Sequence, residues 1–161
     1  MDWPIEIKND ENIVRAICSP FHIKNGIQLK HQAFRPPAGS DEVSVMRPDW
    51  IRADACKIHA KNISNLNSNP PKQYEGLAVI SAEKIRDTKA EVIDSRHLFQ
   101  GHADIKHGCE FAIKKGEPED PKVLEKLNER NKRLAEMANY HRDPNPTNNT
   151  WEGPPLIYKQ S

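Results

Sequence analysis

Thirteen prolines divide this chain of 161 residues into short segments. A proline lacks the backbone N–H and interrupts the hydrogen bonding of a helix or of a central strand. Only 36% of the residues are hydrophobic, so the core has to be small. The length corresponds to about one domain, and we therefore expect a compact centre with long ordered loops or loose ends.

The charges of the chain are balanced, with 24 Lys and Arg against 23 Asp and Glu. Such a chain has no overall field that would draw it to nucleic acid or to an anionic membrane. No apolar run approaches the ~20 residues of a membrane span, and the first residues lack the pattern of a secretory signal. The three cysteines are far apart and indicate thiols in a reducing compartment. We therefore expect a cytoplasmic protein.

Runs of alternating or continuous apolar residues predict the strands. We expect strands at about 12–18, 27–34, 43–47, 74–80, 90–94 and 109–113. Helices are expected over about 49–63, with Asp49 as the N-cap, and from Pro121 to about Tyr140; Ser81 can cap a third, short helix. Short connections favour antiparallel pairing. The predicted fold class is α+β, with a small, mainly antiparallel sheet, two or three helices and an extended Pro-rich C-terminal tail.

The character of the sequence changes after the last expected strand. We expect an α+β core over residues 1–118, an amphipathic helix over 119–142 and a Pro-rich tail over 143–161. Leu134 belongs to the apolar stripe of this helix, which packs on the core or on a partner. Trp151 either anchors the tail on the domain or belongs to a disordered end that binds a partner.

The densest group of ionisable side chains lies between Gln100 and Cys109. Cleavage or transfer at a phosphate or ribose without a metal needs a proton shuttle and a cation. His102 titrates near neutral pH and is the candidate acid–base catalyst, with Arg15 as phosphate clamp and Ser44 as the residue that orients the substrate. The competing interpretation of His102 is a turn residue with an ordinary hydrogen bond.

Other arginines and the metal-ligating residue types extend the list of candidates. Arg35 and Arg47 are further groups that could bind an anion. Arg15 either reaches solvent from an edge strand or needs a partner, because a buried charge without one is costly. Zinc-compatible donors are present at Cys56, His59, His107 and Cys109. Their spacing matches no known zinc finger, so we expect ordinary structural or surface roles for them and no metal or other cofactor.

Several segments together resemble a family of small bacterial hypothetical proteins. The segments are Ile13-Val14-Arg15, Ala33-Phe34-Arg35-Pro36, Val43-Ser44-Val45, Gly76-Leu77-Ala78-Val79-Ile80, Val92-Ile93-Asp94 and His102-Ala103-Asp104-Ile105. Members of that family carry an AF…SV segment, a G-apolar-A strand and a final HA-x-apolar strand. The resemblance covers about residues 12–106 and implies a bacterial origin and a single cytosolic domain. The family has no established activity, so the resemblance implies none here.

Two functions from different classes fit these observations. The first is a small binding or accessory protein that acts with another protein, encoded by a neighbouring gene, in a defence or toxin-type system. The alternative is an enzyme acting on a nucleotide, NAD or RNA through Arg15, Ser44 and His102. It requires these three side chains to meet within about a hydrogen bond, or one bridging water, of a common point. The sequence specifies neither the substrate nor the partner nor the oligomeric state.

Overall fold

The computed structural model describes residues 3–64, 72–114 and 116–157. These residues form an α+β fold with a six-stranded sheet, a separate two-stranded hairpin and three α-helices. The α-helices are α1 (Ala53–Ser64), α2 (Ala82–Asp87) and α3 (Pro121–Met137), and short 3-10 turns are η1 (His31–Phe34) and η2 (Cys109–Phe111). None of the described helices is long and apolar enough to cross a membrane.

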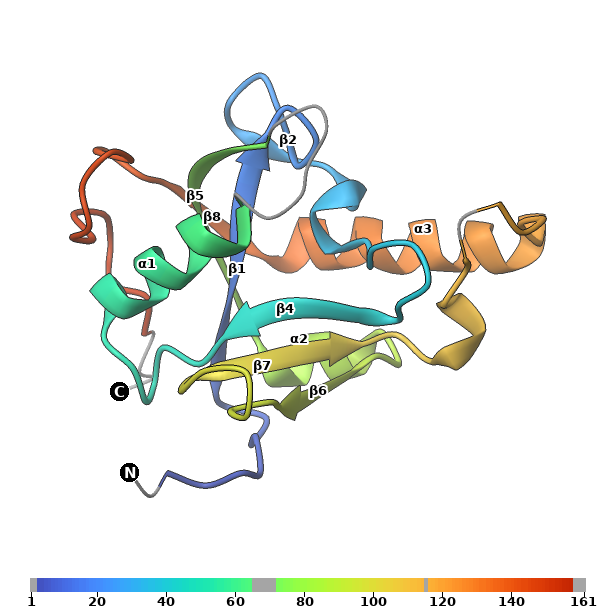
Figure 1. Cartoon of the computed structure of the whole chain (residues 1–161), viewed down its shortest axis with the longest axis horizontal. Coiled ribbons are helices and arrows are strands. Elements are labelled where there is room, and N and C mark those ends of the chain that lie inside the picture. The colour runs from blue at the N-terminus through green and yellow to red at the C-terminus, as the bar shows by residue number, and fades with distance from the viewer. Residues whose placement is uncertain (1–2, 65–71, 115, 158–161) are drawn as a thin grey trace.

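All neighbouring strands of the large sheet are antiparallel. In sheet order they are β6 (Glu91–Asp94), β7 (His102–Lys106), β4 (Glu42–Met46), β1 (Asn12–Ser19), β5 (Gln73–Ser81) and β8 (Asn139–Arg142). In Figure 1, β1 runs up the page while β4 and β7 run across it, and β1 meets β4 in the single pair Val14↔Met46. The hairpin consists of β2 (Ile23–Lys24) and β3 (Gln28–Leu29), joined by the expected Asn-Gly turn.

Each face of the sheet carries its own core. The first core joins the sheet to α2, α3 and η1, and its large buried members include Ile13, Ile17, Phe34, Ile85, Ile105 and Leu134. The second core packs α1 against β1 and β5, and includes Val14, Ala16, Met46, Cys56, Ala60, Leu77 and Val79. Side chains alternate between the two faces of a strand. Ser44 therefore lies on the same face as Met46, and Arg15 lies on the face of Ile13 and Ile17.

Local signals explain where two of the helices begin. The Ser81 hydroxyl accepts a hydrogen bond from the Lys84 amide at the start of α2, as its sequence predicts. Asp120 accepts from the Lys122 amide, and Pro121 occupies the first turn of α3. The prediction for α1 was wrong at its start. Asp49 is not the N-cap of α1, which begins only at Ala53. The Asp49 carboxylate instead accepts a hydrogen bond from the side-chain amide of Asn12, at 3.3 Å.

Three further segments differ from the sequence-based prediction. Residues 27–34 form β3 and η1 instead of one strand: the chain leaves the hairpin after Leu29, and η1 buries Ala33 and Phe34 in the core. The strand expected at 109–113 is η2, and Gly108, with φ of 118°, turns the chain before it. The C-terminal helix ends at Met137, and β8 follows it as an edge strand of the sheet.

The residues after β8 lie against α1. The Lys57 ammonium, whose side chain is fully buried, donates to the Asn145 and Thr150 carbonyls, at 2.6 and 2.9 Å, and pairs with Asp143 at 2.9 Å. The Trp151 amide donates to the Asp54 carboxylate at 2.7 Å. Because Leu156 is also buried in the core beneath α1, residues 143–157 are held along this helix by buried contacts.

A second buried cation ties the other end of the sheet together. Arg47 follows β4 and is completely buried. Its guanidinium donates two hydrogen bonds to Glu11, at 2.5 and 2.8 Å, and one each to Asp94 and the Pro4 carbonyl, at 2.7 and 2.8 Å. The N-terminal segment, β4 and β6 thus meet at one charged group.

We predict that Arg47→Met lowers the free energy of unfolding by about 3–5 kcal/mol, because Glu11 would stay buried without its counter-ion. Asp94 would lose one of its two arginine partners and keep Arg96, 2.8 Å away. Urea unfolding followed by circular dichroism measures the loss. The matched control is Arg35→Met, because the Arg35 side chain is 42% exposed and 3.9 Å from Glu119. That change should cost less than ~1 kcal/mol. Equal effects of the two substitutions would contradict this role of Arg47.

Candidate functional site around His102

His102 is placed by the sheet, as the first residue of β7. It lies opposite Met46 of β4, and Asp104 lies between Ser44 on β4 and Ile93 on β6. Directly opposed residues of an antiparallel pair share a face. The side chains of His102, Asp104 and Ser44 are therefore on the face to which α1 belongs. The helix packs over β1 and β5, so these residues lie beside it.

His102 is enclosed by polar and aromatic groups. Its Nδ1 is 2.5 Å from the Ser95 hydroxyl, and its Nε2 is 3.9 Å from the Asp104 carboxylate. The ring of Phe99 meets the imidazole edge-on at 4.6 Å between centroids and stacks on the ring of His59 at 3.8 Å. We call Ser95, Phe99, His102 and Asp104, with His59, the His102 cluster.

Burial changes the protonation of this cluster. It lowers the pKa of His102 to about 4, and the neighbouring His97 and His59 act in the same direction, against a hydrogen bond to Ser95. Burial also raises the pKa of Asp104, opposed by hydrogen bonds to Ser95 and Glu42. At neutral pH His102 is therefore neutral and carries one ring proton. The Ser95 hydroxyl has a single proton and also bonds to Asp104, so the ring tautomer decides whether Ser95 or His102 Nδ1 donates between them.

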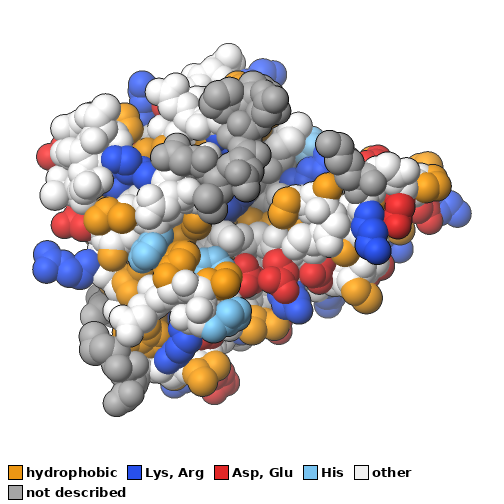
Figure 2. All heavy atoms as spheres, in the orientation of Figure 1, with side chains coloured by type: hydrophobic (Ala, Val, Ile, Leu, Met, Phe, Trp, Pro, Cys, Tyr) orange, Lys and Arg blue, Asp and Glu red, His pale blue; other side chains and the backbone are white. Residues whose placement is uncertain are grey.

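The chemistry open to this arrangement is proton transfer between Ser95 and His102, which are in hydrogen-bond contact, whereas Asp104 is 3.9 Å from His102 and beyond a direct hydrogen bond. The His102 side chain itself is almost fully buried. His97 is exposed and His59 is half-buried, so these two histidines near His102 are more accessible to solvent than His102 itself. On the face shown in Figure 2, histidine side chains gather among apolar side chains, and a short row of acidic side chains lies beside them.

The structure brings Ser44 and His102 onto one face and places Arg15 on the other. The Arg15 guanidinium donates to the carbonyls of Ala33 and Ser44, at 2.8 and 3.0 Å. Burial lowers the pKa of Arg15 to about 10. Arg15 lies on a central strand, so it does not reach solvent from an edge strand as one of the two interpretations supposed. Its partners are backbone carbonyls, and the three side chains do not meet at a common point.

The other candidate binding residues have separate surroundings. Arg47 is occupied by Glu11 and Asp94, and Leu134 is fully buried in the core beneath α3. The stripe of α3 that contains Leu134 thus packs on its own sheet. Arg35 is exposed near Glu119, and Trp151, which is half-buried, donates from its indole to the Pro154 carbonyl.

The candidate zinc ligands are also dispersed. Cys56 is buried on the side of α1 that faces the sheet, where burial raises its pKa to about 12, and His59 stacks on Phe99. The imidazole of His107 is hydrogen-bonded to the Phe34 carbonyl, and Cys109 is exposed. Within residues 3–64, 72–114 and 116–157, no group of three or more His, Cys, Asp or Glu side chains could hold a metal ion.

The sequence analysis missed Ser95 and Phe99 as neighbours of His102, and Glu42 as a neighbour of Asp104. Ser95 is the first residue after β6, and its amide donates to the His102 carbonyl at 2.9 Å, which extends the pairing of β6 with β7. That pairing could have been inferred from the two short strands and the short connection between them. Nothing in the sequence indicated that Phe99 would reach His59 on α1.

We predict that stability falls with decreasing pH between about 6.5 and 4. The unfolded chain binds a proton at His102 near its ordinary pKa of about 6.5, whereas the folded chain binds it only near 4. The stability from neutral His102 is therefore present above pH 6.5 and lost as pH falls towards 4. Urea unfolding of His102→Gln should flatten this dependence by up to about 1.4 kcal/mol per pH unit. An unchanged slope would contradict the buried, neutral state of His102.

Comparison with known proteins assigns no family or function to the chain. Searches of protein-family models, of curated proteins and of solved structures find no match to the chain. The resemblance of residues 12–106 to a family of small bacterial proteins therefore stays a prediction.

Proposed function

We propose that this chain is a small binding protein that acts together with another protein in the bacterial cytoplasm. The partner is the product of a neighbouring gene, in a defence or toxin-type system. The observation that carries the proposal is the use of the buried cations. Arg15, Arg47 and Lys57 each bond to carbonyls or carboxylates of their own chain. They support the fold and are not free to stabilise charge on a substrate.

The surface beside the His102 cluster suits a protein partner. Ile93 is 45% exposed and lies next to Asp104 on the sheet, and Leu98 is 61% exposed in the connection between β6 and β7. We define the docking face as Ile93, His97, Leu98 and Phe99. Exposed apolar side chains next to polar ones are common at protein interfaces. The carboxylates of Glu42 and Asp104 beside this face favour a partner with an apolar anchor flanked by Lys or Arg.

Coexpression with the products of the adjacent genes tests this proposal. Size-exclusion chromatography with light scattering should detect one heterocomplex. Leu98→Asp should weaken it at least about tenfold, because a charge would replace an apolar contact in the interface. The control is Ile58→Asp, since Ile58 is 39% exposed on α1, away from the buried Cys56 and Ala60. A chain that remains alone with every neighbouring product, or a complex indifferent to Leu98→Asp, would contradict the proposal.

A second candidate function is acid–base catalysis on a nucleotide, NAD or RNA. The observation in its favour is the pair His102 and Asp104, because burial lowers the pKa of the first and raises that of the second. Two such groups suit proton transfer. Ser44 lies beside Asp104 as a further polar group, whereas Arg15 faces the other side of the sheet.

This second function predicts turnover that depends on His102. The purified chain is incubated with NAD, with nucleoside triphosphates and with RNA, and the products are separated by chromatography. Under the enzyme hypothesis, His102→Gln and Asp104→Asn each lower the rate at least about 100-fold, the usual size of an acid–base contribution. His107→Gln is the control, because His107 is bonded to the Phe34 carbonyl, outside the His102 cluster. No product with the unmodified chain removes this candidate for the three substrate classes.

A further inference from the structure

The edge strand β8 presents backbone groups to the outside of the sheet. The Asp143 amide donates to the Glu75 carbonyl at 2.9 Å, and the register continues through Arg142↔Gly76, His141↔Leu77 and Tyr140↔Ala78. In an antiparallel pair, hydrogen-bonded and non-bonded positions alternate. Asp143, His141 and Asn139 therefore bond to β5. Tyr140 and Arg142 direct their N–H and C=O groups away from it.

The opposite edge of the sheet is arranged differently. At β6, Val92 and Asp94 face outward, and the Val92 amide donates to the carboxylate of Glu91 at 2.9 Å. Arg86 holds the same carboxylate at 2.6 Å. Charged side chains of this kind protect an edge strand from pairing with another chain. Among the described residues, no such partner is found for the outward amides of Tyr140 and Arg142.

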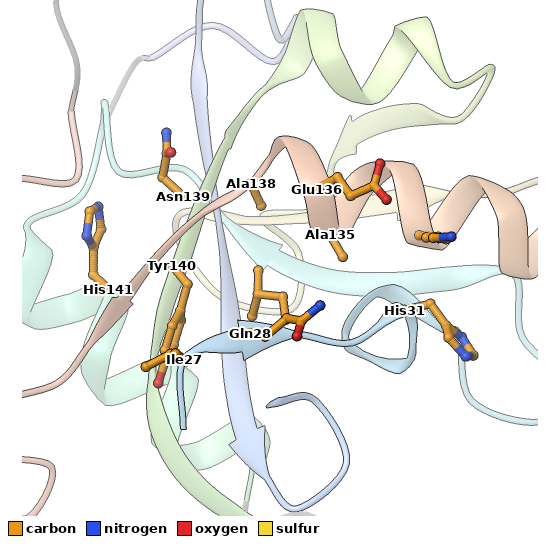
Figure 3. A pocket seen from close by; sticks show the side chains of 11 residues that line it. Ile27, Gln28, His31, Ala135, Glu136, Ala138, Asn139, Tyr140 and His141 are labelled. Atoms are coloured by element: carbon orange, nitrogen blue, oxygen red, sulfur yellow. The ribbon is translucent and has the colours of Figure 1, made fainter. Parts of the chain in front are cut away.

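A hollow of about 630 Å³ lies along β8. It is bordered by the end of α3, by η1 and by the hairpin, and its apolar lining includes Ile27, Leu29, Ala135 and Ala138. Ile27 is 79% exposed at the tip of the hairpin. In Figure 3, Tyr140 points from β8 towards the hairpin residues Ile27 and Gln28, whereas His141 points to the other side of the strand. The hollow and the outward backbone groups of β8 are therefore neighbours.

Two polar atoms beside this hollow are buried without a hydrogen-bond partner among the described residues. They are the hydroxyl of Tyr140 and Nδ1 of His31. Leaving a buried polar atom unpaired costs about 1–3 kcal/mol. Burial raises the pKa of Tyr140 to about 12, so its hydroxyl keeps its proton and can donate. Both atoms would be satisfied by a ligand that carries polar groups into the hollow.

We propose that an extended peptide segment of a partner protein pairs with β8 as an additional strand of the sheet. Its backbone bonds to the N–H and C=O groups of Tyr140 and Arg142. One apolar side chain enters the hollow between α3 and the hairpin, and a carbonyl or side-chain oxygen accepts from the Tyr140 hydroxyl. This mode of recognition takes its affinity from main-chain hydrogen bonds and its specificity from the pocket for a side chain. The surface is separate from the docking face defined above, which lies around β6 and β7.

The paired variants Arg142→Pro and Arg142→Ala test this inference. Proline at position 142 removes the outward N–H, whereas alanine removes the side chain and keeps that N–H. Pairing with β5 should survive both changes, because Arg142 is a non-bonded position towards Gly76, and proline is tolerated on edge strands. A displayed library of linear peptides is selected against the unmodified chain, and the enriched peptides are measured against each variant by titration calorimetry.

We expect Arg142→Pro to weaken peptide binding about tenfold or more and Arg142→Ala to change it less than about threefold. Tyr140→Phe should weaken binding several-fold without lowering stability, because its hydroxyl has no partner within the described chain. Peptide binding should also slow amide exchange at Tyr140 and Arg142, a readout that does not depend on any variant folding. Absence of enriched peptides, equal binding by Arg142→Pro, or protection elsewhere on the chain would each overturn the inference. None of these results bears on the docking face.

Discussion

The pairing of buried cations with groups from distant parts of the chain is the interaction on which the fold depends. Arg47 joins Glu11, before β1, to Asp94, at the end of β6. Lys57 holds the segment after β8 against α1 through Asp143. Buried charges are costly unless they are paired and hydrogen-bonded. Only 36% of the residues are hydrophobic. These ion pairs therefore add to apolar packing in holding the segment before β1 and the segment after β8 on the sheet and on α1.

The same pairing limits what the molecule can do. Because Arg15, Arg47 and Lys57 are saturated by their own chain, they stabilise no charge on a substrate. The His102 cluster, whose central imidazole is buried and neutral at pH 7, is the candidate site for acid–base chemistry. Among the described residues, two surfaces are suited to a protein partner: the docking face beside that cluster and the edge of β8 with its hollow. These surfaces support the proposal that the chain is a domain that binds other proteins.

Local patterns in the sequence predicted many of the strands and helices. They did not predict the contacts between residues far apart in the chain. Alternation and apolar runs identified the strands near 43–47, 74–80 and 90–94, and Pro121 marked the start of α3. β8 was missed because Asn139-Tyr140-His141-Arg142 is polar and short, and its pairing depends on Gly76. A Cβ at position 76 would collide with the His141 carbonyl oxygen, and this constraint appears only in the folded chain. The sequence showed that Arg15 needs partners, but its two carbonyl acceptors come from segments far along the chain.

The claim that this domain keeps an open strand edge for a partner is tested most directly by amide hydrogen exchange of the free protein, resolved residue by residue with NMR. In β8 and the residue after it, we expect slow exchange at His141 and Asp143, whose amides bond to β5, and fast exchange at Tyr140 and Arg142. Such alternation would establish that half of the backbone groups of β8 are free to pair. Uniformly slow exchange across Tyr140 to Asp143 would mean that the edge is already covered, and would contradict the account.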